Sequence, residues 1–184
     1  MITTLTREQA LNLVKLDNRV LITKATVLPE EGRCTLLSMG ENKIDYILYP
    51  SKHGWKQQTI EVEEVKPIME WKKVGSRRMV VHVEQPDYPQ VHEYFLNIYY
   101  TGDVAMAFIN GYLELDHFYY GAPWTIGLKR FRSQLEKYDM NFYIRPMRKD
   151  APYINDLPAH AIPDFNKKGE NCVFRKVEVV PEYK

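Results

Sequence analysis

The sequence predicts an all-β protein, an antiparallel β-sandwich of jelly-roll type with a short N-terminal helix. Two observations carry this prediction. Apolar and polar residues alternate along Val104–Ile109 and Tyr112–Phe118, and Asn110-Gly111 between them favours a type I′ turn, so the two segments form a β-hairpin. Further alternating segments, about ten in all, are separated by glycine and proline turns along the whole chain. Closely spaced short strands are typical of a sandwich or barrel.

The first half of the chain begins with a helix and continues with strands. Thr6 and Gln9 have the spacing of a capping box, in which each side chain accepts a hydrogen bond from the other residue's backbone N–H. A helix over Arg7–Lys15 is expected to follow, because its apolar residues recur at helical spacing. The strands expected after it are Val20–Leu28, Arg33–Met39, Lys43–Tyr49, Thr59–Val65 and Arg78–Val83.

In the second half, Tyr94–Tyr100 precedes the hairpin across the turn Thr101-Gly102-Asp103. These three consecutive strands are therefore expected to form a meander. Ile126–Leu135 fits either a strand or a short helix, and Ala151–Phe165, with three prolines, predicts an ordered loop without regular structure. Two more strands are expected at Met140–Met147 and Val173–Val180.

The chain length suits one domain over residues 1–184, which would bury roughly 70% of the surface that the unfolded chain exposes. The candidate internal boundary is Val74-Gly75-Ser76. We interpret it as a loop, because the strand pattern is the same on both sides.

Charge and cysteine content argue against several classes of partner. Lys and Arg number 25 against 24 Asp and Glu, and the net charge of +1 gives no field that would attract nucleic acid or an anionic membrane. No run approaches the ~20 apolar residues of a membrane-spanning helix. Cys34 and Cys172 belong to no CxxC pair, so buried free thiols and a single bridge both remain open, while a zinc or redox role is not expected.

No residue is assigned to catalysis or to metal binding. The histidines never fall at i,i+2 or i,i+4, the spacings of a local metal pair, and are His53, His82, His92, His117 and His160. Two carboxylate pairs lie two residues apart on expected strands, about 6.6 Å between Cα atoms, within the roughly 5–9.5 Å used by glycosidases. They are Glu61 with Glu63, and Glu114 with Asp116. A solvated strand face explains them more simply, because no apolar pocket adjoins them that would raise one pKa.

Aromatic residues give the candidate binding site. The loop after the hairpin carries three large rings, Tyr119, Tyr120 and Trp124, which could stack on the flat faces of sugars, while Asp116 or His117 could bond the hydroxyls. The simpler alternative is that Phe118 and Trp124 close one end of the sandwich and the tyrosines form its rim. Both interpretations predict that this loop sits beside the hairpin.

The same stretch carries a family resemblance. The segment from Tyr94 to Phe131 resembles the C-terminal β-sandwich region of bacterial β-galactosidases of glycoside hydrolase family thirty-five. The matching motifs are Gly102-Asp103-Val104-Ala105, Ile109-Asn110-Gly111, Asp116-His117-Phe118-Tyr119 and Trp124-x-Ile126-Gly127-Leu128. The opening, Leu5–Gly32, is similar to the passage that leaves the catalytic barrel of such proteins and enters the first sandwich strands.

The resemblance implies a galactose-binding-like jelly roll that packs on a catalytic barrel and shapes its substrate cleft. In that family, two glutamates on a (β/α)₈ barrel hydrolyse terminal β-galactosides. Such a barrel needs about 250 residues, and this chain has 184 without βα alternation.

We therefore expect a non-catalytic accessory or carbohydrate-binding domain. The alternatives are a purely structural domain and a small stand-alone glycoside hydrolase. The expected partners are a β-galactoside and the catalytic barrel of the same parent protein. No cofactor is expected, with a structural calcium ion left open, and the resemblance implies a periplasmic or extracellular location.

Overall fold

The computed structural model describes residues 4–51 and 54–184. Strands make up 56% of it and helical turns 11%, arranged as several antiparallel sheets with a short N-terminal helix, so the all-β prediction is confirmed. The contacts divide the chain into two compact units. Unit 1 comprises Met1–Val65, Asp87–Glu93 and Pro181–Lys184, and unit 2 comprises Lys66–Pro86 and Tyr94–Val180.

Unit 1 begins with α1 (Arg7–Leu11), and the predicted capping box is present: Gln9 N donates to the Thr6 hydroxyl at 3.1 Å and Thr6 N donates to Gln9 Oε1 at 2.9 Å. The helix is shorter than expected. Its C-cap is Asn12, and Leu11 is 75% exposed, so no packed face extends the helix. The residues that follow form strand β1 (Leu13–Leu16) instead.

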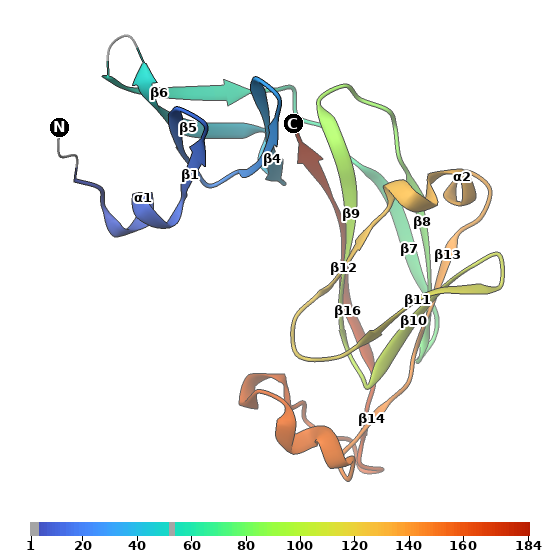
Figure 1. Ribbon diagram of the computed structural model, residues 1–184. Coiled ribbons are helices and arrows are strands. Elements are labelled where there is room, and N and C mark those ends of the chain that lie inside the picture. The colour runs from blue at the N-terminus through green and yellow to red at the C-terminus, as the bar shows by residue number, and fades with distance from the viewer. Residues whose placement is uncertain (1–3, 52–53) are drawn as a thin grey trace. The chain divides into compact units, whose positions relative to one another are not determined.

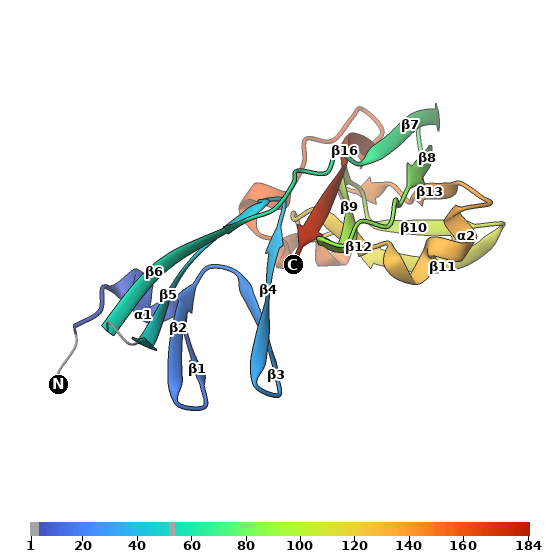
Figure 2. The same ribbon diagram turned by 90° about the horizontal axis from the view of Figure 1, so that it is seen from above.

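The main sheet of unit 1 has the order β1-β2-β5-β6, in which β2 is Arg19–Thr23, β5 is Lys43–Ser51 and β6 is Gly54–Glu61. A separate hairpin is made by β3 (Thr26–Glu30) and β4 (Arg33–Met39), as Figure 2 shows. Three residues form the core between sheet and hairpin, and they are Leu21, Leu36 and Ile44.

Two strand predictions in unit 1 are wrong in extent. The expected strand Val20–Leu28 is interrupted after Thr23, whose hydroxyl donates to Asp45 O at 2.9 Å and accepts from Ala25 N at 3.2 Å. The expected strand Thr59–Val65 stops at Glu61. Val65, beyond the end of the strand, is nevertheless buried, and its backbone N–H donates to the Tyr183 hydroxyl at 2.9 Å.

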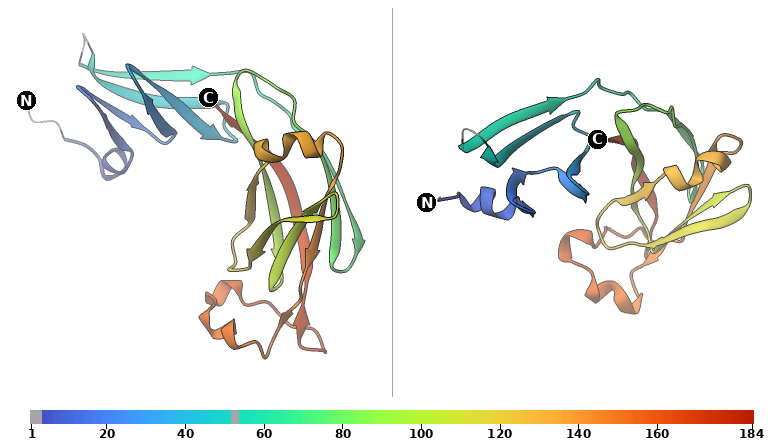
Figure 3. Two further views of the ribbon diagram at one scale, coloured as in Figure 1. Left: turned by 45° about the vertical axis from the view of Figure 1, so that its right-hand side comes forward. Right: turned by 45° about the horizontal axis from the view of Figure 1, so that its top comes forward.

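Unit 2 contains a β-sandwich (Figures 1 and 3). One sheet has the order β11-β10-β13-β8-β7, and the other, within this unit, has the order β12-β9-β16. Their bounds are β7 Ile68–Gly75, β8 Arg78–Glu84, β9 Val91–Thr101, β10 Val104–Ile109, β11 Tyr112–Phe118, β12 Trp124–Gly127, β13 Met140–Ile144 and β16 Val173–Tyr183. The sheets enclose buried residues that include Met79, Leu96, Ile126, Phe142 and Phe174. The turn Val74-Gly75-Ser76 lies within this unit, at the β7–β8 hairpin.

The predicted meander is wrong. The hairpin β10–β11 is present, and Asn110 and Gly111 take the positive φ values of 51° and 83° that a type I′ turn requires. However, β9 pairs with β12 and β16 in one sheet, while β10 pairs with β11 and β13 in the other. The turn at Gly102 therefore carries the chain from one sheet of the sandwich to the other, which alternating polarity cannot reveal. A jelly-roll topology stays a prediction.

Short helical segments complete unit 2. Ile126–Leu135 combines both alternatives, since β12 is followed by η1 (Lys129–Phe131) and α2 (Arg132–Leu135). The segment predicted to lack regular structure contains the 3₁₀ helices η2 (Pro152–Asp156) and η3 (Ala159–Ala161), coloured orange in Figure 1. It is framed by the two-stranded ladder β14 (Met147–Arg148) and β15 (Glu170–Asn171). In the described part of the chain, no helix has the length and apolar character to span a membrane.

Candidate functional site

The rings of the predicted sugar site are mostly inside the protein. Trp124 and Tyr119 are only 6% and 8% exposed. Trp124 stacks on His117, with ring centroids 5.3 Å apart and planes 10° apart, and meets the Phe142 ring edge-on at 5.8 Å. Tyr119 packs edge-on against Tyr100 at 5.6 Å. Neighbouring protein rings therefore occupy the faces that a sugar would need.

His117 and Tyr100 form the polar centre of this aromatic cluster. The Tyr100 hydroxyl donates to the His117 carbonyl at 2.9 Å and lies 2.8 Å from His117 Nδ1. Because a hydroxyl has one proton, Nδ1–H is the donor in the second bond, which selects the neutral Nδ1–H tautomer. Burial lowers the pKa of His117, against the opposing effect of Asp116, and burial raises the pKa of Tyr100.

The other two predicted residues do not join this cluster on one surface. Asp116 and His117 are successive residues of β11, so their side chains point to opposite faces of the sheet. Asp116 is exposed, while His117 faces the sandwich interior. Tyr120 is 54% exposed, and its ring lies 5.4 Å from that of His117. Of the five residues, Asp116 and Tyr120 are exposed and His117 is partly exposed. Phe118 is 68% exposed, so it does not close the end of the sandwich as the simpler alternative expected.

A second polar cluster, which the sequence did not predict as a site, lies at the turn between β9 and β10. Asp103 is buried, and Arg145 Nε donates to its Oδ2 at 2.6 Å. Its backbone also bridges two segments, since Asp103 N donates to Arg145 O at 2.8 Å and Asp103 O accepts from Tyr119 N at 3.0 Å. The pKa of Tyr153 is raised by burial and by a hydrogen bond with Asp103. The hydrogen bond with Tyr153 links η2 to this turn, and the bond from Tyr119 N links the loop that begins at Tyr119 to it.

The carboxylate pairs do not form an acid–base site. Glu61 and Glu63 are both exposed, and Glu63 lies beyond the end of β6. In β11 the register shifts opposite Ala107 and Phe108, so Glu114 is an extra residue in a β-bulge and its spacing to Asp116 is not that of a regular strand. Glu114 Oε1 accepts from Gln134 Nε2 at 2.8 Å.

The histidines do not gather either. His82 Nδ1 lies 2.9 Å from Asp139 Oδ1, His92 Nε2 lies 4.0 Å from Glu182 Oε2, and His53 is outside the described residues. Within residues 4–51 and 54–184, no three His, Cys, Asp or Glu side chains are grouped so that they could hold a metal ion.

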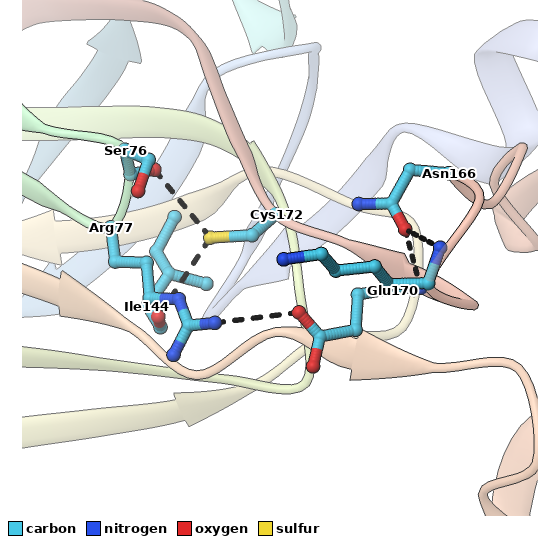
Figure 4. A network of polar contacts seen from close by, with 7 residues as sticks. Ser76, Arg77, Ile144, Asn166, Glu170 and Cys172 are labelled. Atoms are coloured by element: carbon cyan, nitrogen blue, oxygen red, sulfur yellow. Dashed lines mark hydrogen bonds and ion pairs between the residues drawn. The ribbon is translucent and has the colours of Figure 1, made fainter.

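Both cysteines are free and half-buried, so the single-bridge alternative is not realised. Figure 4 shows the surroundings of Cys172, whose Sγ lies 3.7 Å from the carbonyl oxygens of Ser76 and Ile144. Burial raises the pKa of this thiol. Beside it, Arg77 pairs with Glu170 at 3.4 Å. The thiol is thus kept protonated in a structural contact.

Each unit contains a hollow lined by described residues. In unit 1, about 690 Å³ is lined by residues of α1 and of strands β2, β4 and β5, among them Thr23, Leu37 and Asp45. In unit 2, about 420 Å³ is lined by Val74, Arg78, Met79, Phe108, Asn141, Phe142 and Tyr143. The sequence predicted none of the residues that line the second hollow as a binding residue.

Comparison of the chain with protein-family models, curated proteins and solved structures gave no match.

Proposed function

We propose that this chain is a non-catalytic accessory β-sandwich of a β-galactosidase-like glycoside hydrolase, and that it binds carbohydrate beside a catalytic barrel outside the chain. The observation that supports this proposal is the structural role of the residues carrying the family resemblance. On β12, Trp124 and Ile126 are buried, and Leu128 follows as a fully buried residue. Asp103 and His117 hold the adjoining turns by hydrogen bonds. These motifs specify a scaffold, as expected of an accessory domain.

The two alternatives make different demands on the structure. A stand-alone hydrolase needs two carboxylates at one cleft, with one against an apolar wall that raises its pKa. Both candidate pairs lack this arrangement. A purely structural domain needs no exposed ring at all, and the buried rings of Trp124 and Tyr119 agree with it. The hollow of unit 2, lined by the partly exposed rings of Phe108 and Tyr143, favours carbohydrate binding over that alternative.

The test is calorimetric titration of the whole chain with galactose, lactose and longer β-galactosides, together with a chromogenic β-galactoside assay. We expect saturable binding at millimolar ligand and no turnover. A matched glucoside, cellobiose, serves as the control ligand for sugar selectivity. Turnover would identify a hydrolase, and the absence of heat with every galactoside would identify a structural domain.

A further inference from the structure

The five-stranded sheet of unit 2 has two faces of different character. Burial alternates along its strands: Met79, Val81 and Phe142 are at most 2% exposed and face the sandwich interior. The residues between them point to the other side, here called the outer face. Along β13, Asn141 is exposed and Tyr143 half-buried on this face, opposite to Phe142. Of the seven residues that line the hollow of about 420 Å³, four lie on the outer face: Arg78, Phe108, Asn141 and Tyr143.

The strand register places two aromatic rings on the outer face at a distance that suits a sugar. Phe108 of β10 is paired with Asn141 of β13, and Met106 is paired with Tyr143. Phe108 and Tyr143 are therefore diagonal neighbours, with Cα atoms roughly 7–8 Å apart. Neither ring stacks on another ring in the described part of the chain. Both residues are partly exposed and line the hollow, so a ligand in the hollow can contact both rings.

Polar groups surround the two rings. Pairing between neighbouring strands β11, β10, β13 and β8 places four residues side by side in one row across the sheet. In that order they are Asp116, Met106, Tyr143 and Arg78. Within residues 4–51 and 54–184, the guanidinium of Arg78 makes no ion pair and no side-chain hydrogen bond. Asn141 Nδ2 donates to Asp139 O at 3.2 Å, which leaves its amide oxygen as an acceptor. The outer face therefore offers donors, acceptors and ring faces together.

We propose that this hollow, formed by Arg78, Phe108, Asn141 and Tyr143, is a saccharide-binding site. Its volume falls in the range of about 300–1,000 Å³ of small-molecule sites, and a pyranose presents one apolar C–H face and a rim of hydroxyls. The C–H face contacts the rings of Phe108 and Tyr143, while Arg78 donates to hydroxyl oxygens and the Asn141 amide oxygen accepts from them. An inorganic anion fits less well, because Arg78 is the only cationic residue among the described residues that line the hollow, and Asp116 lies in the same row.

The ligand class follows from the proposed function, on which this inference rests. A terminal β-galactoside has an axial 4-hydroxyl, which leaves the C–H groups of C3, C4 and C5 together on the opposite face of the ring. That patch is the part of the sugar that two adjacent aromatic rings can cover. The site thus lies on the outer face of the sheet rather than on the Tyr119–Trp124 loop.

The experiment titrates lactose into the whole chain and four variants. Tyr143→Ala and Phe108→Ala remove the proposed contacts, and we expect each to weaken binding roughly tenfold, as for the loss of one stacking ring. Tyr112→Ala is the matched control, because Tyr112 is 71% exposed at the hairpin end of the same sheet but outside the hollow. Tyr120→Ala tests the exposed ring of the loop. Neither control should change the affinity.

A second measurement guards against misfolded variants. Backbone amide shifts of the wild-type chain on lactose addition should change along β8, β10 and β13 and not along the Tyr119–Trp124 loop. The proposed site would be wrong if Tyr143→Ala and Phe108→Ala bound lactose as tightly as the wild-type chain, or if the shift changes were confined to the loop. Either result would leave the proposed function standing. No binding of any galactoside by the wild-type chain would overturn both.

Discussion

His117 combines three contacts in one side chain. Its ring stacks on Trp124, its Nδ1 bonds the Tyr100 hydroxyl, and its carbonyl accepts from that same hydroxyl. Protonating the ring would place a charge in a partly buried aromatic setting, which is why its pKa is lowered in the folded state. This single residue therefore couples the stability of the sandwich to pH.

We expect the free energy of unfolding to fall on acidification below about pH 6.5, the ordinary pKa of an unfolded histidine. The unfolded chain binds the proton first, because the folded pKa is lower. The stabilising effect of the neutral ring is thus complete above that pH and is lost as the pH drops toward the folded value. The slope of the unfolding free energy stays below about 1.4 kcal/mol per pH unit, because one histidine exchanges at most one proton.

His117→Phe is the comparison variant, measured by denaturant unfolding between pH 4 and 8. It keeps a ring against Trp124, and the Tyr100 hydroxyl can still donate to the carbonyl of residue 117. The difference in unfolding free energy between the two proteins should change with pH only in the acidic part of the range. A constant difference would show that His117 does not titrate differently on folding.

At this scale the sequence located the rings but not their environment. Tyr119, Tyr120 and Trp124 are close along the chain and follow a turn, so the sequence predicts that they share one loop. Burial depends on what packs against them, and Phe142 and Tyr100 come from other strands. Arg145 was missed for the same reason: its partner Asp103 lies 42 residues earlier in the chain.

At the scale of elements, the tight turn between β9 and β10 depends on Gly102. A Cβ at this position would lie 2.2 Å from Ile144 Cγ2 and 3.0 Å from Arg145 O. Ile144 is fully buried, so it has no room to move away. The absence of a side chain lets the chain pass from one sheet to the other directly against β13.

Gly102→Ala should therefore destabilise the protein by about 1–3 kcal/mol, the usual cost of overpacking a core. The measurement is thermal or urea unfolding, with Gly111→Ala as the control, because a Cβ at Gly111 meets no atom within 4 Å and its cost comes from positive φ alone. In a double-mutant cycle, Ile144→Ala should offset part of the Gly102→Ala cost. Additive effects of the two substitutions would contradict the steric explanation.

The sequence predicted where strands form much better than it predicted which strands pair with one another. The β10–β11 hairpin follows from local chemistry, because two residues of positive φ fix both the turn and the register. The strand β9 shows the same alternation, yet its partners are β12 and β16. The Gly102 crossover and the bulge at Glu114 are set by packing between segments distant in sequence. The alternation of apolar and polar residues along the chain therefore does not predict them.

At the scale of the whole molecule, the chain leaves unit 1 after Val65 and returns to it for Pro181–Lys184. The returning segment is integral to that unit. Tyr183 is 2% exposed and its hydroxyl accepts from Val65 N, while Pro181 O accepts from Gly40 N at 2.8 Å. Glu182 and Tyr183 also pair with β4.

Deleting residues 181–184 should destabilise unit 1 by about 3–5 kcal/mol, the cost of removing one large buried aromatic side chain, and leave two backbone donors unpaired. Hydrogen exchange is the measurement: protection should fall at Gly40 and Val65 and persist in the strands of the five-stranded sheet. Tyr183→Phe is the milder variant, expected to affect mainly the Val65 amide. Uniform loss of protection in both units would show instead that they unfold together.

The division into two units was not predictable from the sequence. The candidate boundary at Val74-Gly75-Ser76 rested on local composition, and the structure places this turn inside a hairpin of unit 2. A unit assembled from three chain segments has no single linker for composition to mark. The alternation of apolar and polar residues continues through both units, so it gives no sign of the division between them.

This discontinuity has a consequence for synthesis on the ribosome. The strands of β1 to β6 emerge early, but their unit is completed only when Tyr183 has been added, about 120 residues after Val65. At ordinary translation rates the delay is on the order of ten seconds. During that time the early strands expose unpaired edges in the nascent chain. We therefore expect chaperones to bind the nascent chain at β1 to β6 more than at the strands of unit 2, which are synthesised later.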